Sequence, residues 1–154
     1  MQLSTKGRYA VMAMTDLARH EQGRAVALAD IAARQQLSLS YLEQLFARLR
    51  RGGLVRSVRG PGGGYRLART AAETRVVDIV CAVDEPLHVV RCEGAKGCML
   101  AGERCLTHDL WDALGQTIHD FLAGVSLADV IERRVSATPG PTSARPGARA
   151  GMAA

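Results

Sequence analysis

The chain has 154 residues, of which 47% are hydrophobic and 23% charged, so it is long enough for one domain of ordinary size with a buried core. No stretch approaches the roughly 18 uninterrupted apolar residues of a membrane span, and the first residues lead into no apolar signal region. We therefore expect a cytoplasmic protein that makes no membrane contact. In that compartment the four cysteines favour metal binding or thiol chemistry over disulfides.

The net charge of +5 is unevenly distributed along the chain. Residues 1–70 contain twelve Lys or Arg and four Asp or Glu, a balance of +8, whereas residues 71–154 have a balance of −3. The first half is the expected polyanion-binding half. A basic surface that merely faces solvent is the alternative.

Helical spacing of apolar residues predicts three helices at the N-terminus. The first follows TKGRYAVMAMTDLARH (5–20), the second is short and runs from about 28 to 35, and the third covers LSLSYLEQLFARLRR (37–51). Either Ser38 or Ser40 would cap the third helix, and Ser40 would form a capping box with Glu43. The apolar face of the third helix consists of Leu42, Leu45, Phe46 and Leu49.

A β-hairpin is predicted after the third helix, which ends at Gly52-Gly53. Two short alternating stretches, LVRSVR (54–59) and YRLAR (65–69), are separated by Gly60-Pro61-Gly62-Gly63-Gly64, which predicts a flexible tip. Three helices and a hairpin are the order of a winged helix-turn-helix. The glycine run lacks the lysine of a phosphate-binding loop and the spacing of a dinucleotide fingerprint, so it does not indicate a nucleotide cofactor.

The second half of the chain predicts more helices around a cysteine-containing loop. A fourth helix lies in TRVVDIVCAVDE, where Cys81 is expected to be a small buried residue, and a long helix runs from about Thr107 to Ala123. Ser126 and Asp129 have the spacing of a capping box for a last short helix that ends near Arg134. An apolar stripe on the long helix predicts a two-fold dimer, with packing inside one chain as the alternative; it consists of Leu110, Leu114, Ile118, Phe121 and Leu122.

The predicted fold class is mainly α with a small β-hairpin wing, a winged helix-turn-helix followed by a long dimerisation helix. We assign residues 1–84 to the winged helix-turn-helix DNA-binding domain, 85–108 to a cysteine loop, 107–134 to the dimerisation helices and 135–154 to a disordered tail. The tail is rich in Pro, Gly, Ser and Ala, with almost nothing to bury.

The third helix carries a polar stripe opposite its apolar face, which as the second helix of a helix-turn-helix is predicted to enter a major groove. Gln can read adenine, Glu can accept from cytosine, Arg suits guanine or phosphate, and Ser and Tyr suit phosphates or base edges. A wing tip without side chains would let an arginine approach a narrow minor groove. The alternative is a solvated helix face. The candidate DNA-binding residues are Ser38, Ser40, Tyr41, Glu43, Gln44, Arg48, Arg51, Arg59 and Gly60.

The stretch RCEGAKGCMLAGERCLTH holds three of the four cysteines. Cys92 is followed after five residues by Cys98, after six more by Cys105, and after two more by His108, so only the last pair has the tight separation of zinc modules. The wide gaps suit a larger object, and the glycines and basic residues between them would free the backbone and offset the charge of thiolates and sulfides. A zinc site and a Cys-His nucleophile are alternatives, although no group that would orient such a nucleophile is identified.

Four segments together resemble the IscR-type family of iron-sulfur cluster regulators, which are winged-helix repressors that carry a [2Fe-2S] cluster. They are LSLSYLEQLFARLR, SVRGPGGGYRLAR, AVDE and RCEGAKGCMLAGERCLTH, in that order, and the resemblance covers about residues 1–131. It implies cluster ligation by Cys92, Cys98, Cys105 and His108. It also implies DNA contact through Ser40 to Gln44 and the wing at Arg59, and a homodimer built on the long helix. The gap of six residues between Cys98 and Cys105 is one longer than is usual in the family.

These patterns predict a dimeric transcription regulator, not an enzyme, that binds a palindromic operator in double-stranded DNA. Its [2Fe-2S] cluster would report iron-sulfur supply, or oxidative or nitrosative damage. The resemblance implies control of iron-sulfur cluster assembly genes, with iron-sulfur assembly proteins as cluster donors. The alternatives are a winged-helix regulator with structural zinc and a thiol-based redox switch.

Overall fold

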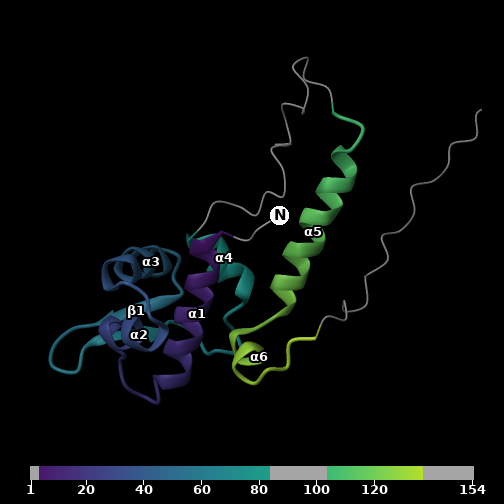
Figure 1. Cartoon of the computed structure of the whole chain (residues 1–154). Helices are drawn as coiled ribbons and strands as arrows, with labels where there is room; N and C mark the ends of the chain where they lie inside the picture. The colour runs from purple at the N-terminus through teal and green to yellow at the C-terminus, as the bar shows by residue number, and fades with distance from the viewer. Residues whose placement is uncertain (1–3, 84–103, 137–154) are drawn as a thin grey trace, which may run out of the picture.

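The computed structural model describes residues 4–83 and 104–136 (Figure 1). Cys92, Cys98 and most of the predicted cysteine loop lie outside the described residues, as does the predicted tail from residue 137 on. The elements are α1 (Thr5–His20), α2 (Leu28–Gln35), α3 (Leu39–Arg51), β1 (Val55–Val58), β2 (Gly64–Leu67), α4 (Val76–Val83), α5 (His108–Gly124) and α6 (Leu127–Ile131). This order confirms the predicted winged helix-turn-helix with a hairpin wing and a long helix behind it. None of the described helices is long and apolar enough to span a bilayer.

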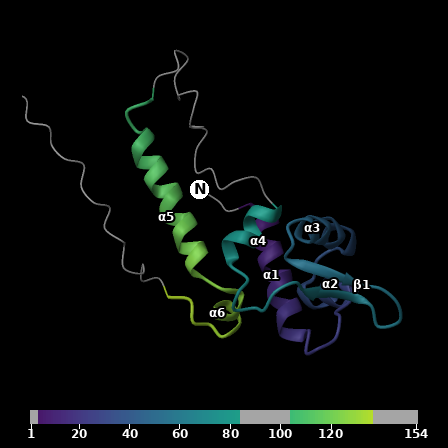
Figure 2. The same cartoon turned by 180° about the vertical axis from the view of Figure 1, so that it is seen from behind.

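The core is built around α1, which packs against α2, α3, α4, α6 and β2 (Figures 1 and 2). Its side chains Ala10, Met14 and Leu17 are fully buried. The predicted apolar face of α3 is confirmed, because its four members are all at most 2% exposed. Removal of this apolar surface from water is the main driving force for docking the helices.

The apolar residues of α4 face the core, but Cys81 does not. Val76, Val77, Ile79, Val80 and Val83 are buried, whereas Cys81 is exposed. The prediction of a buried Cys81 is therefore wrong. Cys81 lies one helical turn after Asp78, on the side of α4 that turns away from the core.

A serine side chain caps the N-terminus of both α3 and α6. The Oγ of Ser38 accepts from the backbone N–H of Tyr41 at 3.2 Å, so Ser38, and not Ser40, caps α3. The predicted capping box of Ser126 and Asp129 is confirmed at the start of α6. The prediction that this helix ends near Arg134 is wrong, because α6 ends at Ile131 and the φ of +54° at Arg133 is left-handed.

Backbone hydrogen bonds anchor the junction between α5 and α6 to the segment before α4. The N–H of Val76 donates to the carbonyl of Val125 at 3.0 Å, and the N–H of Leu127 donates to the carbonyl of Thr74 at 2.8 Å. Leu127 is fully buried. These contacts hold the C-terminal end of α5, and from there the helix extends away from the winged helix (Figures 1 and 2). Among the described residues, two members of its apolar stripe are exposed, Leu110 at 61% and Phe121 at 40%, whereas Leu114, Ile118 and Leu122 are half-buried.

The hairpin pairs Val55 with Leu67 and Val58 with Gly64 in antiparallel register. Its tip is a hydrogen-bonded turn in which the N–H of Gly63 donates to the carbonyl of Gly60 at 2.9 Å. Proline at the second position and a φ of +71° at Gly62 are typical of a type II turn. The predicted hairpin turn is confirmed, with its tip at residues 60–63.

A third backbone segment joins the hairpin at Val26, just before α2. Val26 and Tyr65 exchange hydrogen bonds of 2.9 and 2.8 Å in both directions. The neighbouring Gly64 has a φ of +152°, and a Cβ at this position would collide with the carbonyl oxygen of Val26. Only glycine therefore allows the wing strand to approach the start of α2 so closely.

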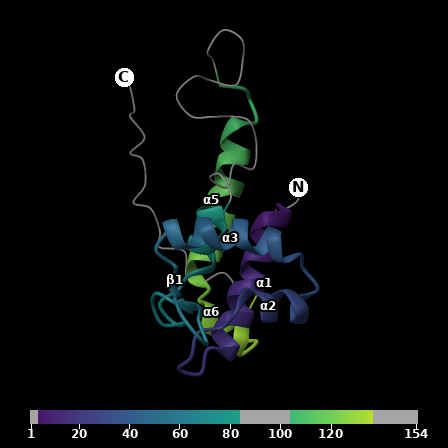
Figure 3. The same ribbon diagram turned by 90° about the vertical axis from the view of Figure 1, so that its left-hand side faces the viewer.

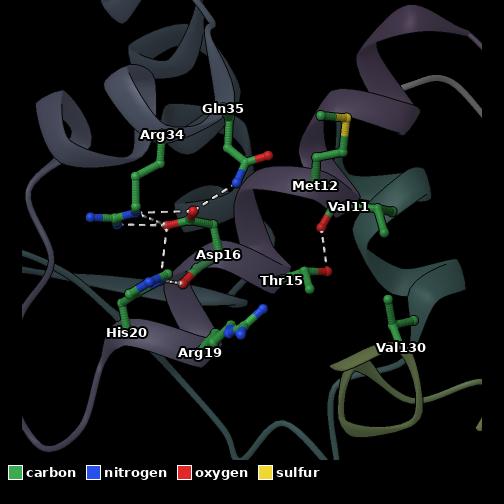
Figure 4. A pocket seen from close by; sticks show the side chains of 9 residues that line it. All are labelled: Val11, Met12, Thr15, Asp16, Arg19, His20, Arg34, Gln35 and Val130. Carbon is green, nitrogen blue, oxygen red and sulfur yellow. Dashed lines mark hydrogen bonds and ion pairs between the residues drawn. The ribbon is translucent and has the colours of Figure 1, made fainter. Parts of the chain in front are cut away.

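A buried carboxylate joins α1 to α2 (Figure 4). Asp16, whose side chain is 2% exposed, accepts hydrogen bonds from Arg34 at 2.6 to 3.1 Å and from Gln35 at 2.7 Å. Burial alone raises the pKa of this carboxyl, but the hydrogen bonds from Arg34 and Gln35 and the charges of Arg34 and His20 outweigh it, so the pKa lies below its ordinary value of 3.8. These side chains line a pocket of about 440 Å³ that Val130 of α6 closes on one side.

We expect Gly64→Ala to lower the free energy of unfolding by about 2 to 3 kcal/mol, because the added Cβ pushes β2 away from Val26. Gly124→Ala is the matched control, since nothing lies within 4 Å of its added Cβ at the end of α5. The control should leave stability unchanged or raise it by up to about 1 kcal/mol. Urea titrations followed by circular dichroism measure both, and equal stabilities of the two variants would contradict the close approach.

The lowered pKa of Asp16 makes its contribution to stability pH-dependent. A carboxylate whose pKa is lower in the folded than in the unfolded chain stabilises the fold above the unfolded pKa, and this stabilisation is lost as the pH falls through the folded value. We expect Asp16→Asn to cost about 1 to 3 kcal/mol at pH 7 and to flatten stability below pH 4. The exposed Asp30→Asn, with the same loss of charge, should cost less than about 1 kcal/mol. Urea titrations from pH 3 to 7 measure both, and equal pH dependence in the two variants would disprove the role of Asp16.

Candidate nucleic-acid interface

The helix α3 and the hairpin lie on the side of the molecule away from α5. Figure 3 views this side, with α3 across the molecule and the hairpin beside it. Their relative placement is fixed by the ring of Tyr65 in β2, which packs edge-on against Phe46 of α3 at a centroid distance of 4.9 Å. The candidate recognition helix and the candidate wing are thus held in one geometry.

The first two turns of α3 present polar side chains that the rest of the structure does not use. Ser40, Glu43 and Gln44 are exposed. Glu43 and Gln44 make no side-chain hydrogen bond or ion pair to another residue in the described parts of the chain. A glutamine and a glutamate with free polar ends on one face of a helix have the chemistry that reads base edges.

Three other candidates, at the start of α3 or within it, make contacts inside the described structure, and the sequence predicts only the first of these, as one of two alternatives. Ser38 caps the helix, as described above. The ring of Tyr41 packs edge-on against Tyr9 of α1, with centroids 6.0 Å apart and planes at 87°. Arg48 donates from Nη1 to the carbonyl of Val83 at the end of α4, at 3.1 Å. Each of these side chains therefore has a structural role in addition to any contact with DNA.

Positive charge gathers at the end of α3 and in the wing. Arg48, Arg50 and Arg51 occupy the last turn of α3, where cations also stabilise the helix dipole. Arg59 and Gly60 are exposed at the entry to the wing turn. Guanidinium groups at both places suit phosphates on either side of a groove.

Sequence reasoning missed the residue that holds β2 to α1. Glu21, which caps α1, accepts from Nε of Arg66 at 3.0 Å with one carboxylate oxygen and from the backbone N–H of Leu67 at 3.0 Å with the other. This bidentate contact fixes the second wing strand from outside the core. No local sequence signal marks Glu21, because its partners are 45 and 46 residues away.

The structure describes two of the four predicted cluster ligands, and they lie together at the start of α5. The backbone N–H of His108 donates to the carbonyl of Cys105 at 3.0 Å. His108 is 7% exposed, and Cys105 is half-buried. In residues 4–83 and 104–136 no three His, Cys, Asp or Glu gather as a metal site, and Cys92 and Cys98 lie outside these ranges. A thiol and an imidazole one helical turn apart are compatible with iron, copper or zinc.

The fourth cysteine has a different character. Partial burial of the sulfur and the charge of Asp78 raise the pKa of the Cys81 thiol. A thiol kept protonated in this way is a poor metal ligand and a poor nucleophile.

Comparison with known proteins gives one consistent family. Residues 3–133 match the family Rrf2, described as "Iron-dependent Transcriptional regulator". The chain is 54% identical over 134 residues to the HTH-type transcriptional regulator IscR of Xenorhabdus nematophila, which covers 87% of this chain and 81% of that protein.

Two solved structures have the same fold. T. potens IscR superposes with a TM-score of 0.71 at 35% identity, over 96% of this chain and 94% of that one. CymR, the global cysteine regulator of B. subtilis, superposes with a TM-score of 0.73 at 32% identity, over 86% of this chain and 98% of that one. These relatives are transcriptional regulators and not enzymes. The winged helix, its exposed recognition face and these matches together show that the chain belongs to the Rrf2 family of helix-turn-helix transcriptional regulators.

Proposed function

We propose that this regulator is of the IscR type: a homodimer that binds a palindromic operator and carries a [2Fe-2S] cluster, whose presence changes its affinity or selectivity for DNA. The observation that carries the DNA-binding part is the pairing of an exposed polar face on α3 with an arginine-bearing wing on the same side of the molecule. The similarity to IscR proteins supports the cluster.

On DNA, α3 lies in the major groove and the wing follows the adjacent backbone into the minor groove. Ser40, Glu43 and Gln44 stand in the N-terminal half of α3, the part of a recognition helix that reaches base edges. Arg51 at the other end meets phosphates, and Arg59 enters the minor groove. Ser38, Tyr41, Arg48 and Gly60 complete the proposed contact surface.

The dimer forms through α5 and α6, within residues 107–134. The apolar stripe of α5 is only partly covered by the described residues, with Leu110 and Phe121 exposed, and burial of such a surface stabilises a protein by about 25 cal/mol for each Å². A second copy related by a two-fold axis presents the same stripe and buries both. The two α3 helices then read half-sites one helical turn or a multiple of it apart.

The cluster would be held by Cys92, Cys98, Cys105 and His108, in residues 85–108. When bound it supplies a redox-active, oxygen-sensitive centre. Cys105 offers a thiolate, and His108 offers a neutral imidazole, which can be protonated once it leaves the metal. The bond between the cluster and His108 would therefore be the easiest of the four to break. Iron-sulfur assembly proteins in the cytoplasm donate the cluster, and iron-sulfur assembly genes are the regulated targets.

A thiol-based switch is the second candidate, because the fold also matches CymR, a cysteine regulator. In that case Cys105 would form a reversible disulfide with Cys92 or Cys98 in place of cluster ligation. A regulator with structural zinc at the same residues is the remaining alternative. The three differ in metal content and not in fold.

Anaerobic purification decides between these functions. We expect about two iron and two sulfide for each chain, visible absorbance, and no stoichiometric zinc. Cys92→Ala should lose the cluster but remain a folded dimer, whereas Cys81→Ala, the matched control outside the site, should keep it. One zinc for each chain, or a metal-free protein with an oxidisable thiol pair, would overturn the cluster and leave the DNA-binding proposal standing.

The wing and recognition helix should differ in how they contribute to DNA binding. We expect Gln44→Ala to cost about 1 to 3 kcal/mol at the base that it reads and to relax specificity there. Arg59→Ala should weaken binding most at sites with a narrow minor groove. Affinity for the operator and for single-base variants, measured by fluorescence anisotropy over a salt series, tests both. Equal losses from Gln44→Ala on operator and scrambled DNA would show that Gln44 contacts only the backbone.

A further inference from the structure

The C-terminal ends of α3 and α4 meet at two places. Arg48, in the last turn of α3, donates from Nη1 to the carbonyl oxygen of Val83, the last residue of α4, at 3.1 Å. Gly52, which caps α3, lies so close to α4 that a Cβ there would stand 3.0 Å from the Cβ of Ala82. The two contacts are independent, one a hydrogen bond and the other a steric approach. Together they set the position of one helix end against the other.

The hydrogen bond joins groups with different roles in the proposed function. The guanidinium of Arg48 supplies a donor to this backbone carbonyl and a positive charge beside the C-terminal turn of α4, which the helix dipole favours. Arg48 shares its helix with Glu43 and Gln44, which we propose to contact DNA. Val83 is followed directly in sequence by residues 84–103, which contain two of the proposed cluster ligands.

We propose that Arg48 is a positioning residue that couples the end of α4 to the recognition helix, so that binding of the cluster beyond Val83 is transmitted to α3 through this contact. The inference rests on the proposed cluster-dependent function and goes beyond it by naming the residue that transmits the effect. When the chain after Val83 is held by ligation, the last turn of α4 is fixed and its carbonyl retains Arg48. Without ligation that turn opens more often, and the end of α3 loses its support.

Arg51 provides a matched control on the same helix. It has the same charge and is also exposed, but its Nε donates to the carbonyl of Ala47 within α3, at 3.4 Å, and not to α4. Loss of Arg51 should therefore weaken phosphate contact equally with and without the cluster. Loss of Arg48 should change the difference between the two forms, because the coupling contact is removed along with any phosphate contact.

The experiment measures the Kd for operator DNA at one salt concentration, for the cluster-loaded protein and for protein freed of iron anaerobically by chelation. The quantity compared is the ratio of the two Kd values. We expect Arg48→Ala to move this ratio toward one by about two- to thirtyfold. Arg51→Ala should leave it unchanged while both affinities fall, and Arg48→Lys, which can still donate to one carbonyl, should lie between. Amide hydrogen exchange in residues 80–83 should become faster in Arg48→Ala and stay unchanged in Arg51→Ala.

The outcomes separate this inference from the function on which it rests. If the unmodified protein binds the operator equally with and without the cluster, the cluster-dependent function fails and the coupling fails with it. If the unmodified protein shows a difference that survives Arg48→Ala, or that Arg51→Ala removes just as well, the function stands and Arg48 is not the coupling residue. The proposal is supported if Arg48→Ala alone moves the ratio of the two Kd values toward one and hydrogen exchange at the end of α4 becomes faster.

Discussion

The close contact between Gly64 and Val26 is the constraint on which the proposed DNA-reading surface depends. It brings β2 against the start of α2, where Val26 and Tyr65 exchange backbone hydrogen bonds. With its backbone fixed there, Tyr65 directs its ring at Phe46 on the buried face of α3. The wing and the recognition helix are consequently held together through their inner sides, and their outer sides are left for a ligand. A side chain at position 64 would separate them.

The C-terminal end of α1 and its cap bind both α2 and the wing strand β2. Asp16 binds Arg34 and Gln35 of α2, and Glu21 binds the backbone of β2. Two carboxylates five residues apart thus attach α2 and the wing to α1. The first is almost fully buried and hydrogen-bonded at both oxygens, so its loss leaves a guanidinium and an amide without their acceptor. The second lies nearer the surface and positions the wing more than it stabilises the core.

The described pair of proposed cluster ligands and the proposed dimer surface lie on the other side of the molecule from the wing (Figures 1 and 2). α4 packs on α1 and α3 through a continuous valine and isoleucine face, and α6 closes the base of the domain through Leu127. Between them, the proposed ligands Cys105 and His108 lie just before and at the start of α5, on which Leu110 and Phe121 are exposed. In the proposed function, a signal at these ligands acts on the dimer through α5 and on α3 through the end of α4. The hydrogen bond between Arg48 and Val83 lies on the second route.

The order of elements and the apolar face of α3 can be predicted from the sequence, because both depend on periodicity and on local turn chemistry. The stop at Gly52-Gly53, the capping box at Ser126 and the apolar face of α3 are all read from residues a few positions apart. The similarity of four segments to IscR-type regulators gave the family and the proposed ligand set. Spacing alone left cluster, zinc and thiol switch open.

The contacts that join residues far apart in the chain depend on how the helices and the hairpin pack. The sequence could not choose Ser38 over Ser40 as the cap of α3, and it predicts a buried Cys81, although no residue in the described ranges 4–83 and 104–136 covers that side chain. It described Arg48 as one member of a polar stripe, whereas its partner is the carbonyl of Val83, 35 residues further along the chain. Glu21 was not noticed at all. Helical periodicity records which face of an element is buried, but the identity of a hydrogen-bond partner depends on how the elements pack, which no local pattern encodes.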